Sequence, residues 1–66
     1  MNFPKLRGIL VEKNISYREL SKHLNISLAT LVNKMAGRTQ FTLKEITDIK
    51  KLLDLDSDKM NDIFFN

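Results

Sequence analysis

The chain has 66 residues and no cysteine, which limits it to one small domain, residues 1–66, without disulfides or thiolate–metal sites. Its net charge of +3 is unevenly spread: residues 1–44 carry eight Lys and Arg against two acids, and residues 45–66 carry three against six. The apolar run at 8–11 is too short for a membrane span or an export signal. We therefore expect a soluble cytoplasmic protein whose basic half can face phosphates.

Four copies of one local pattern mark the starts of helices. In each copy an apolar residue precedes a capping residue, and a second apolar residue follows four positions after the cap. The caps are Ser16, Ser27, Thr42 and Asp56. Such a hydrophobic staple across an N-cap is typical of a helix start.

The first helix of the chain is predicted to open at Pro4, because proline is favoured at the first helical position, and to run to about Lys13. Its inner face carries apolar residues at helical spacing, namely Leu6, Ile9 and Leu10. Gly8 within it costs a helix up to about 1 kcal/mol relative to Ala, so we expect it to serve a close contact.

The second and third helices are joined by a tight turn. The second opens after Ser16 and ends at Asn25, since Asn tolerates a positive φ. The third runs from the Ser27 cap to Gly37, a residue typical of helix C-termini. Two short helices with so short a connection form a helix-turn-helix at about 16–36, and this motif points to DNA.

Two further helices complete the chain. The fourth follows Thr42 and is predicted to present four apolar residues at helical spacing: Leu43, Ile46, Ile49 and Leu53. The fifth follows Asp56 and carries Met60, Ile63 and Phe64. No segment alternates apolar and polar residues over the length of a strand. The predicted fold class is all-α, a compact five-helix domain.

The third helix carries the candidate base contacts. Leu31 and Met35 define its core-facing side, so a major groove would meet the other side and the N-terminal turn: Ser27, Leu28, Ala29, Thr30, Val32 and Asn33. Asn33 can bond adenine N6 and N7 together, whereas the apolar members can contact thymine methyls. The third helical position is Thr30, where the second and fourth helices have the glutamate of a capping box. The missing acid suits a helix N-terminus that faces DNA.

Candidate phosphate contacts flank this helix: Tyr17, Lys34, Arg38, Thr39 and Gln40. Tyr17 begins the second helix, where its hydroxyl and the free backbone N–H groups can meet a phosphate. Residues 37–40 offer a cation, a hydroxyl, an amide and exposed backbone donors. For each basic residue the alternative is a solvated surface charge.

Several stretches that span almost the whole chain share one likeness: 16–21, 24–27, 35–37, 41–45 and 63–65. Together they resemble the lambda-repressor-like, Cro-type (XRE-type) helix-turn-helix family, in particular the small phage-derived regulators of Gram-positive bacteria. The resemblance implies a five-helix transcriptional regulator, a repressor of the Cro kind. Such a protein works in a bacterial or phage-infected cell, usually as a homodimer on a palindromic operator in double-stranded DNA, with its recognition helix at 28–36 in the major groove.

The chain departs from the pattern of that family at the third helix. Members usually show Gln, Arg, Ser or Lys there, whereas Leu28, Ala29 and Val32 are apolar. Tyr17 also stands where Gln is common. The apolar face keeps a second hypothesis open, a protein-interaction module that binds another regulator, such as a partner repressor, as an antirepressor or modulator of repression.

The remaining features point to packing rather than chemistry. Phe64 and Phe65 cannot easily share one side of a helix, so one ring is predicted to close the core near Phe3 and the other to be exposed or to form a dimer contact. Residues 54–58 imitate the start of an EF-hand loop but lack its Gly and final Glu. His23 has no second His or Cys with which to bind a metal. We predict no cofactor, no metal site, no membrane contact and no enzymatic activity.

Overall fold

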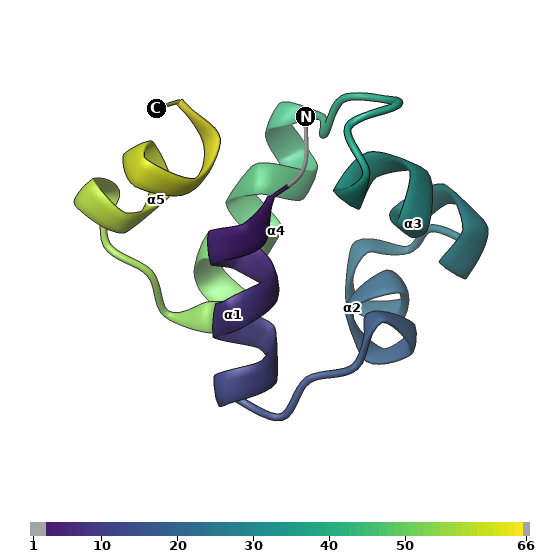
Figure 1. Ribbon diagram of the computed structural model, residues 1–66, viewed down its shortest axis with the longest axis horizontal. Helices are drawn as coiled ribbons and strands as arrows, with labels where there is room; N and C mark the ends of the chain where they lie inside the picture. Colours follow the sequence, from purple (N-terminus) through teal and green to yellow (C-terminus); the bar gives the residue numbers. More distant parts are fainter. Residues whose placement is uncertain (1–2, 66) are drawn as a thin grey trace.

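A computed structural model of the chain describes residues 3–65 and shows α-helices and no strand among them (Figure 1). The helices are α1 (Pro4–Glu12), α2 (Tyr17–Leu24), α3 (Leu28–Met35), α4 (Leu43–Leu53) and α5 (Ser57–Phe64). The all-α fold class and the five predicted helices are confirmed. α1 and α2 each end one residue before the predicted Lys13 and Asn25, and α3 ends two residues before the predicted Gly37. Within residues 3–65, no helix is long and apolar enough to cross a membrane.

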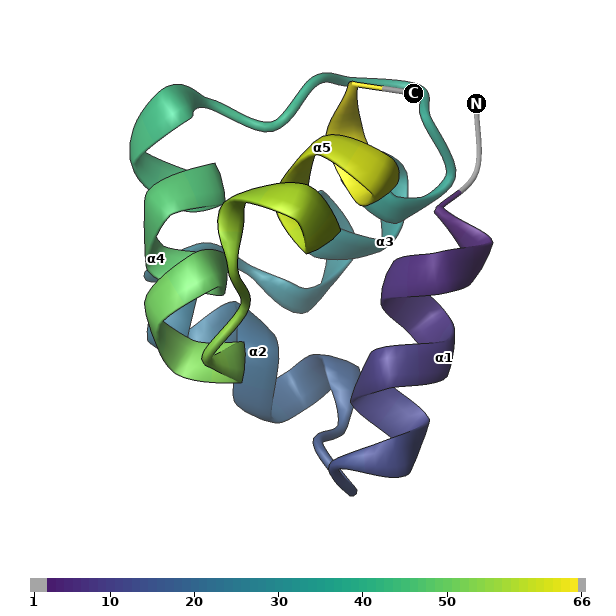
Figure 2. The same cartoon turned by 90° about the vertical axis from the view of Figure 1, so that its left-hand side faces the viewer.

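The helices occupy successive positions along the longest axis of the molecule (Figure 1). α2 and α3 lie together at one end, α5 lies at the other end, and α1 and α4 lie between them (Figure 1). Seen from the α5 end, α4 and α1 flank α5, and α2 and α3 lie behind (Figure 2). α2 packs against both α3 and α4. The two helices predicted to carry function are therefore far from the acidic C-terminal helix.

Each predicted cap begins its helix as expected. The side-chain oxygens of Ser16, Ser27, Thr42 and Asp56 accept hydrogen bonds from the backbone N–H three residues later, at 2.8 to 3.1 Å. Glu19 and Glu45 complete the predicted capping boxes of α2 and α4 by accepting from the cap backbone. A cap of this kind contributes about 1 kcal/mol to helix stability. The four helix starts are thus fixed by local hydrogen bonds.

Four helices also end in the same way, with one residue in the left-handed region. These residues are Asn14, Asn25, Gly37 and Asp54, with φ values of 59°, 59°, 82° and 53°. The next residue in each case donates its backbone N–H to a carbonyl five residues back, at 2.8 to 3.0 Å, as in a Schellman motif. The predictions for Asn25 and Gly37 are confirmed. The other two were not predicted, although each directly precedes an apolar–cap pair just as Asn25 does.

The core is built from one or more residues of every helix. Its buried members are Leu6, Leu10, Leu20, Leu24, Leu31, Met35, Ile49, Leu53 and Ile63. Leu43 was predicted to face this core, but 78% of its surface is exposed. A step of three residues falls short of a full helical turn by about 60°. Two such steps separate Leu43 from Ile49, so Leu43 lies well away from the side of α4 on which Ile49 and Leu53 are buried.

An aromatic cluster closes the core between the N-terminus and α5. The ring centroids of Phe3, Phe41 and Phe64 lie 5.4 to 5.7 Å from one another. The prediction that one ring of the C-terminal pair packs near Phe3 is confirmed for Phe64. Phe65 remains 68% exposed, and its role as a dimer contact stays a prediction.

Gly8 does not make the close contact that we predicted. It is exposed on α1, and a Cβ atom added there would meet nothing within 4 Å. Gly8→Ala is therefore expected to raise the free energy of unfolding by about 0.4–1 kcal/mol, because alanine loses less backbone entropy on entering a helix. Urea denaturation measures this change. Gly37→Ala is the matched control, since its φ of 82° should make the same substitution destabilising.

Candidate nucleic-acid interface

The turn between α2 and α3 sets the orientation of α3 and therefore which of its sides is exposed. Asn25 adopts the left-handed conformation, and the backbone N–H of Ile26 donates to the Ser21 carbonyl at 3.0 Å. Ile26 is half-buried against the core, and Ser21 is buried with its hydroxyl donating to the Arg18 carbonyl at 2.8 Å. Because Ser21 is small and its hydroxyl is satisfied within α2, the neighbouring helices can pack closely there.

α3 has one buried side and one open side. Leu31 and Met35 are 0% and 3% exposed, whereas Leu28 and Val32 are 38% and 41% exposed. Ser27 and Ala29 are also exposed, and Thr30 and Asn33 are half-buried. The six predicted base contacts therefore all lie where solvent, or a bound partner, can reach at least part of each side chain.

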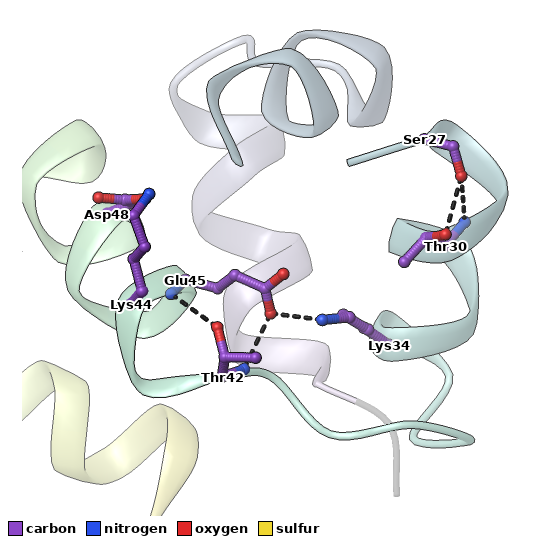
Figure 3. Close-up of polar contacts among 7 residues, drawn as sticks. All are labelled: Ser27, Thr30, Lys34, Thr42, Lys44, Glu45 and Asp48. Atoms are coloured by element: carbon purple, nitrogen blue, oxygen red, sulfur yellow. Dashed lines mark hydrogen bonds and ion pairs between the residues drawn. The ribbon is translucent and has the colours of Figure 1, made fainter. Parts of the chain in front are cut away.

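The two hydroxyls of the first turn of α3 bond to each other. The Ser27 hydroxyl accepts from the Thr30 backbone N–H at 3.1 Å and donates to Thr30 Oγ1 at 2.8 Å (Figure 3). The proton of Ser27 is thereby used within the cap. The Thr30 hydroxyl has further hydrogen-bonding capacity beyond this bond.

Asn33 is held by a residue from the loop after α3. Arg38 Nη1 donates to Asn33 Oδ1 at 3.1 Å, and the backbone N–H of Arg38 donates to the Asn33 carbonyl at 3.0 Å. Sequence reasoning assigned these two residues separately, to a base and to a phosphate. The structure brings them together.

Lys34 does not lie where a phosphate contact requires it. It is 8% exposed, and its ammonium forms an ion pair with Glu45 of α4 at 2.5 Å (Figure 3). We therefore withdraw Lys34 from the predicted phosphate contacts. The physical reason is its position next to Met35 on the side of α3 that packs toward α4, where its long apolar stem can be buried.

The acid of this pair also caps α4. Glu45 Oε1 accepts from the Thr42 backbone N–H at 2.8 Å as well as from Lys34. Burial raises the pKa of the Glu45 carboxyl, but the hydrogen bonds from Lys34 and Thr42 and the Lys34 charge outweigh it. The pKa therefore lies below its ordinary value. One carboxylate thus joins the end of α3 to the start of α4.

The other predicted phosphate contacts are accessible to different degrees. Arg38, Thr39 and Gln40 are exposed in the loop that follows α3. Tyr17 is half-buried at the first position of α2, where its ring packs against the core. Arg38 bonds Asn33 at the end of α3, whereas Thr39 and Gln40 line a pocket together with Phe41 and Phe65. All four residues remain candidates.

The charges carried by α3 itself and by the loops on either side of it are of one sign. Between Leu20 and Lys44 the sequence has no acidic residue, so no carboxylate from this segment lies on α3 or its flanking loops. Four acids instead surround α5, at the opposite end of the molecule: Asp54, Asp56, Asp58 and Asp62 (Figure 1). Asp56 caps α5 as predicted. This separation leaves α3 and its flanking loops without an acidic residue of their own that would repel a polyanion.

Comparison with known proteins gives one match. A family model described as "Protein of unknown function (DUF739)" matches residues 1–66. No curated protein and no solved structure matches the chain. Because the family model covers every residue, the chain belongs to the DUF739 family, whose description leaves its function open.

Proposed function

We propose that this protein is a sequence-specific, DNA-binding transcriptional regulator of the lambda-repressor-like, Cro-type helix-turn-helix kind. The observation that carries the proposal is the open side of α3, which bears hydrogen-bonding and apolar groups without any acid, opposite a fully buried Leu31. Helix-turn-helix proteins place such a second helix in the major groove. α2 and α3, joined by residues 25–27, correspond to that motif in length and connection.

In the proposed complex α3 enters the major groove and its flanks contact the backbone. Ser27, Thr30 and Asn33 supply polar groups to the bases, and Leu28, Ala29 and Val32 supply apolar surface to thymine methyls. Tyr17 and the loop residues Thr39 and Gln40 contact phosphates, and Arg38 lies at the end of α3, where it bonds Asn33. A homodimer would read a palindromic operator, with the exposed Phe65 beside Phe64 as the candidate dimer contact.

Fluorescence anisotropy with DNA from the protein's own promoter region, at several salt concentrations, tests this proposal. We expect a specific complex whose affinity falls steeply as salt increases, because bound phosphates release counterions. Asn33→Ala should cost about 1–3 kcal/mol of binding free energy and relax the preference at one base pair. Lys51→Ala, an exposed charge on the far part of α4, is the control and should leave base preference unchanged. Absence of binding at low salt contradicts the proposal.

One observation favours a second candidate function. Leu28 and Val32 are 38% and 41% exposed on the same helix, next to the exposed Ala29. Apolar groups gathered at the centre of a patch with a polar rim also suit a protein partner. In this case the protein would bind another regulator and modulate repression. Two results together would support this function instead. The wild type would bind a partner repressor but no DNA, and Val32→Asp would lose the binding to the repressor.

A further inference from the structure

We infer that Asn33 and Arg38 act as one hydrogen-bond-donating unit that reads guanine, rather than as an adenine-reading amide and a separate phosphate contact. The inference rests on the proposed DNA-binding function and names the base that this site recognises. It depends on which atoms of Asn33 remain available when Arg38 is bound to it.

The geometry of the helix end holds the pair together. Gly37 follows the last turn of α3 with a φ of 82°, which reverses the chain and returns Arg38 over Asn33. In a Schellman motif the residue after the left-handed position packs against the residue five positions earlier. Here that residue is an arginine, and it bonds Asn33 through both its backbone N–H and its guanidinium, at 3.0 and 3.1 Å. After α1, α2 and α4 the corresponding positions are apolar: Ile15, Ile26 and Leu55.

The chemistry of the guanidinium fixes the orientation of the amide. An arginine side chain has N–H donors and no acceptor, so the atom of Asn33 that faces it must be the carbonyl oxygen. The amide nitrogen, with its two N–H groups, then points away from Arg38. A free asparagine reads adenine because it offers one donor to N7 and one acceptor to N6–H. The Asn33 oxygen has a second lone pair, but the Arg38 cation beside it disfavours the approach of a base N–H group, so Asn33 presents its two N–H donors to a base.

Guanine is the base whose major-groove edge matches two donors, since N7 and O6 both accept. The remaining N–H groups of Arg38 add donors beside the amide. Thr30, one turn earlier on α3, adds a hydroxyl that can also donate (Figure 3). The polar groups on this side of α3 can therefore all donate, which suits guanine better than adenine N6–H or cytosine N4–H.

Selection of binding sites from a library of random duplex DNA tests the inference. We expect the wild-type protein to enrich guanine at the position read by Asn33, and Asn33→Ala to lose that preference. Arg38→Ala frees Asn33 Oδ1, so the preference at the same position should shift from guanine toward adenine by roughly tenfold or more. Lys51→Ala removes one exposed positive charge elsewhere and should keep guanine. Circular dichroism verifies that each variant is folded.

Three outcomes overturn the inference. Enrichment of adenine by the wild type would show that Asn33 reads alone. An Arg38→Ala protein that binds every sequence more weakly but still prefers guanine would reduce Arg38 to a phosphate contact. Failure of the wild type to enrich any sequence, with no salt-dependent binding, removes the proposed DNA-binding function as well, and this result is distinct from the first two.

Discussion

Glu45→Ala is expected to lower the free energy of unfolding by about 3–5 kcal/mol, because removing one member of a buried ion pair leaves the other charge unpaired. The side chains of Lys34 and Glu45 are 11% and 10% exposed, so water can solvate the remaining ammonium only in part. The substitution also removes the acceptor for the Thr42 backbone N–H at the start of α4. A domain of this size is stable by only roughly 3–10 kcal/mol, so the variant should be largely unfolded at moderate urea concentrations.

A double variant separates the charge from the packing. Lys34→Met with Glu45→Gln keeps an apolar stem at one position and a capping-box side chain at the other, with no charge left unpaired. We expect it to recover most of the stability lost in Glu45→Ala. Urea denaturation, monitored by circular dichroism, measures the free energy of unfolding of the wild type, Glu45→Ala and the double variant. A loss below about 1 kcal/mol in Glu45→Ala would show that the pair behaves as an exposed surface contact in solution.

The same carboxylate predicts a loss of stability in acid. The pKa of Glu45 in the folded protein lies below its ordinary value of 4.5, so the unfolded chain binds this proton more readily than the folded one. The contribution of Glu45 is therefore complete above that ordinary pKa and declines as the pH falls through the lower, folded value. Thermal denaturation across this acid range should show a smaller pH dependence in Glu45→Gln than in the wild type. Equal pH dependence in the two proteins would contradict the assignment.

Leu31→Ala is the second substitution with a large expected effect. Leu31 is 0% exposed and, together with Met35, packs α3 against the core. Truncating a buried leucine costs about 2–5 kcal/mol, since the lost contacts add to the cost of the remaining cavity. If the variant is folded, urea denaturation gives the change in its free energy of unfolding directly. If the variant is only marginally stable, its cooperative unfolding transition is shifted toward zero urea.

Leu28→Ala on the same helix is the matched control. Leu28 is 38% exposed, so its truncation should change the free energy of unfolding by no more than about 0.5 kcal/mol. Under the proposed function it should nevertheless weaken DNA binding, because its side chain lies on the open side of α3. If both leucines affected stability equally, the division of α3 into a buried and an open side would be wrong.

Much of the candidate site follows from local sequence. The apolar–cap pairs place the starts of α2 and α3, and the spacing of Leu31 and Met35 selects the side of α3 that is buried. The pairing of Asn33 with Arg38 is also local and could have been predicted from Gly37, because a left-handed glycine returns the next side chain over the last helical turn.

The ends of the helices follow from local sequence, because caps and left-handed residues act through hydrogen bonds to backbone groups only a few positions away. For two side chains, the exposure followed from tertiary packing and not from local sequence. Lys34 was expected at the surface, yet it is buried against Glu45, eleven positions further along the chain. Leu43 was expected in the core, yet it is exposed. The exposure of a side chain depends on which helix packs over it, and that arrangement is set by contacts between segments distant in the sequence.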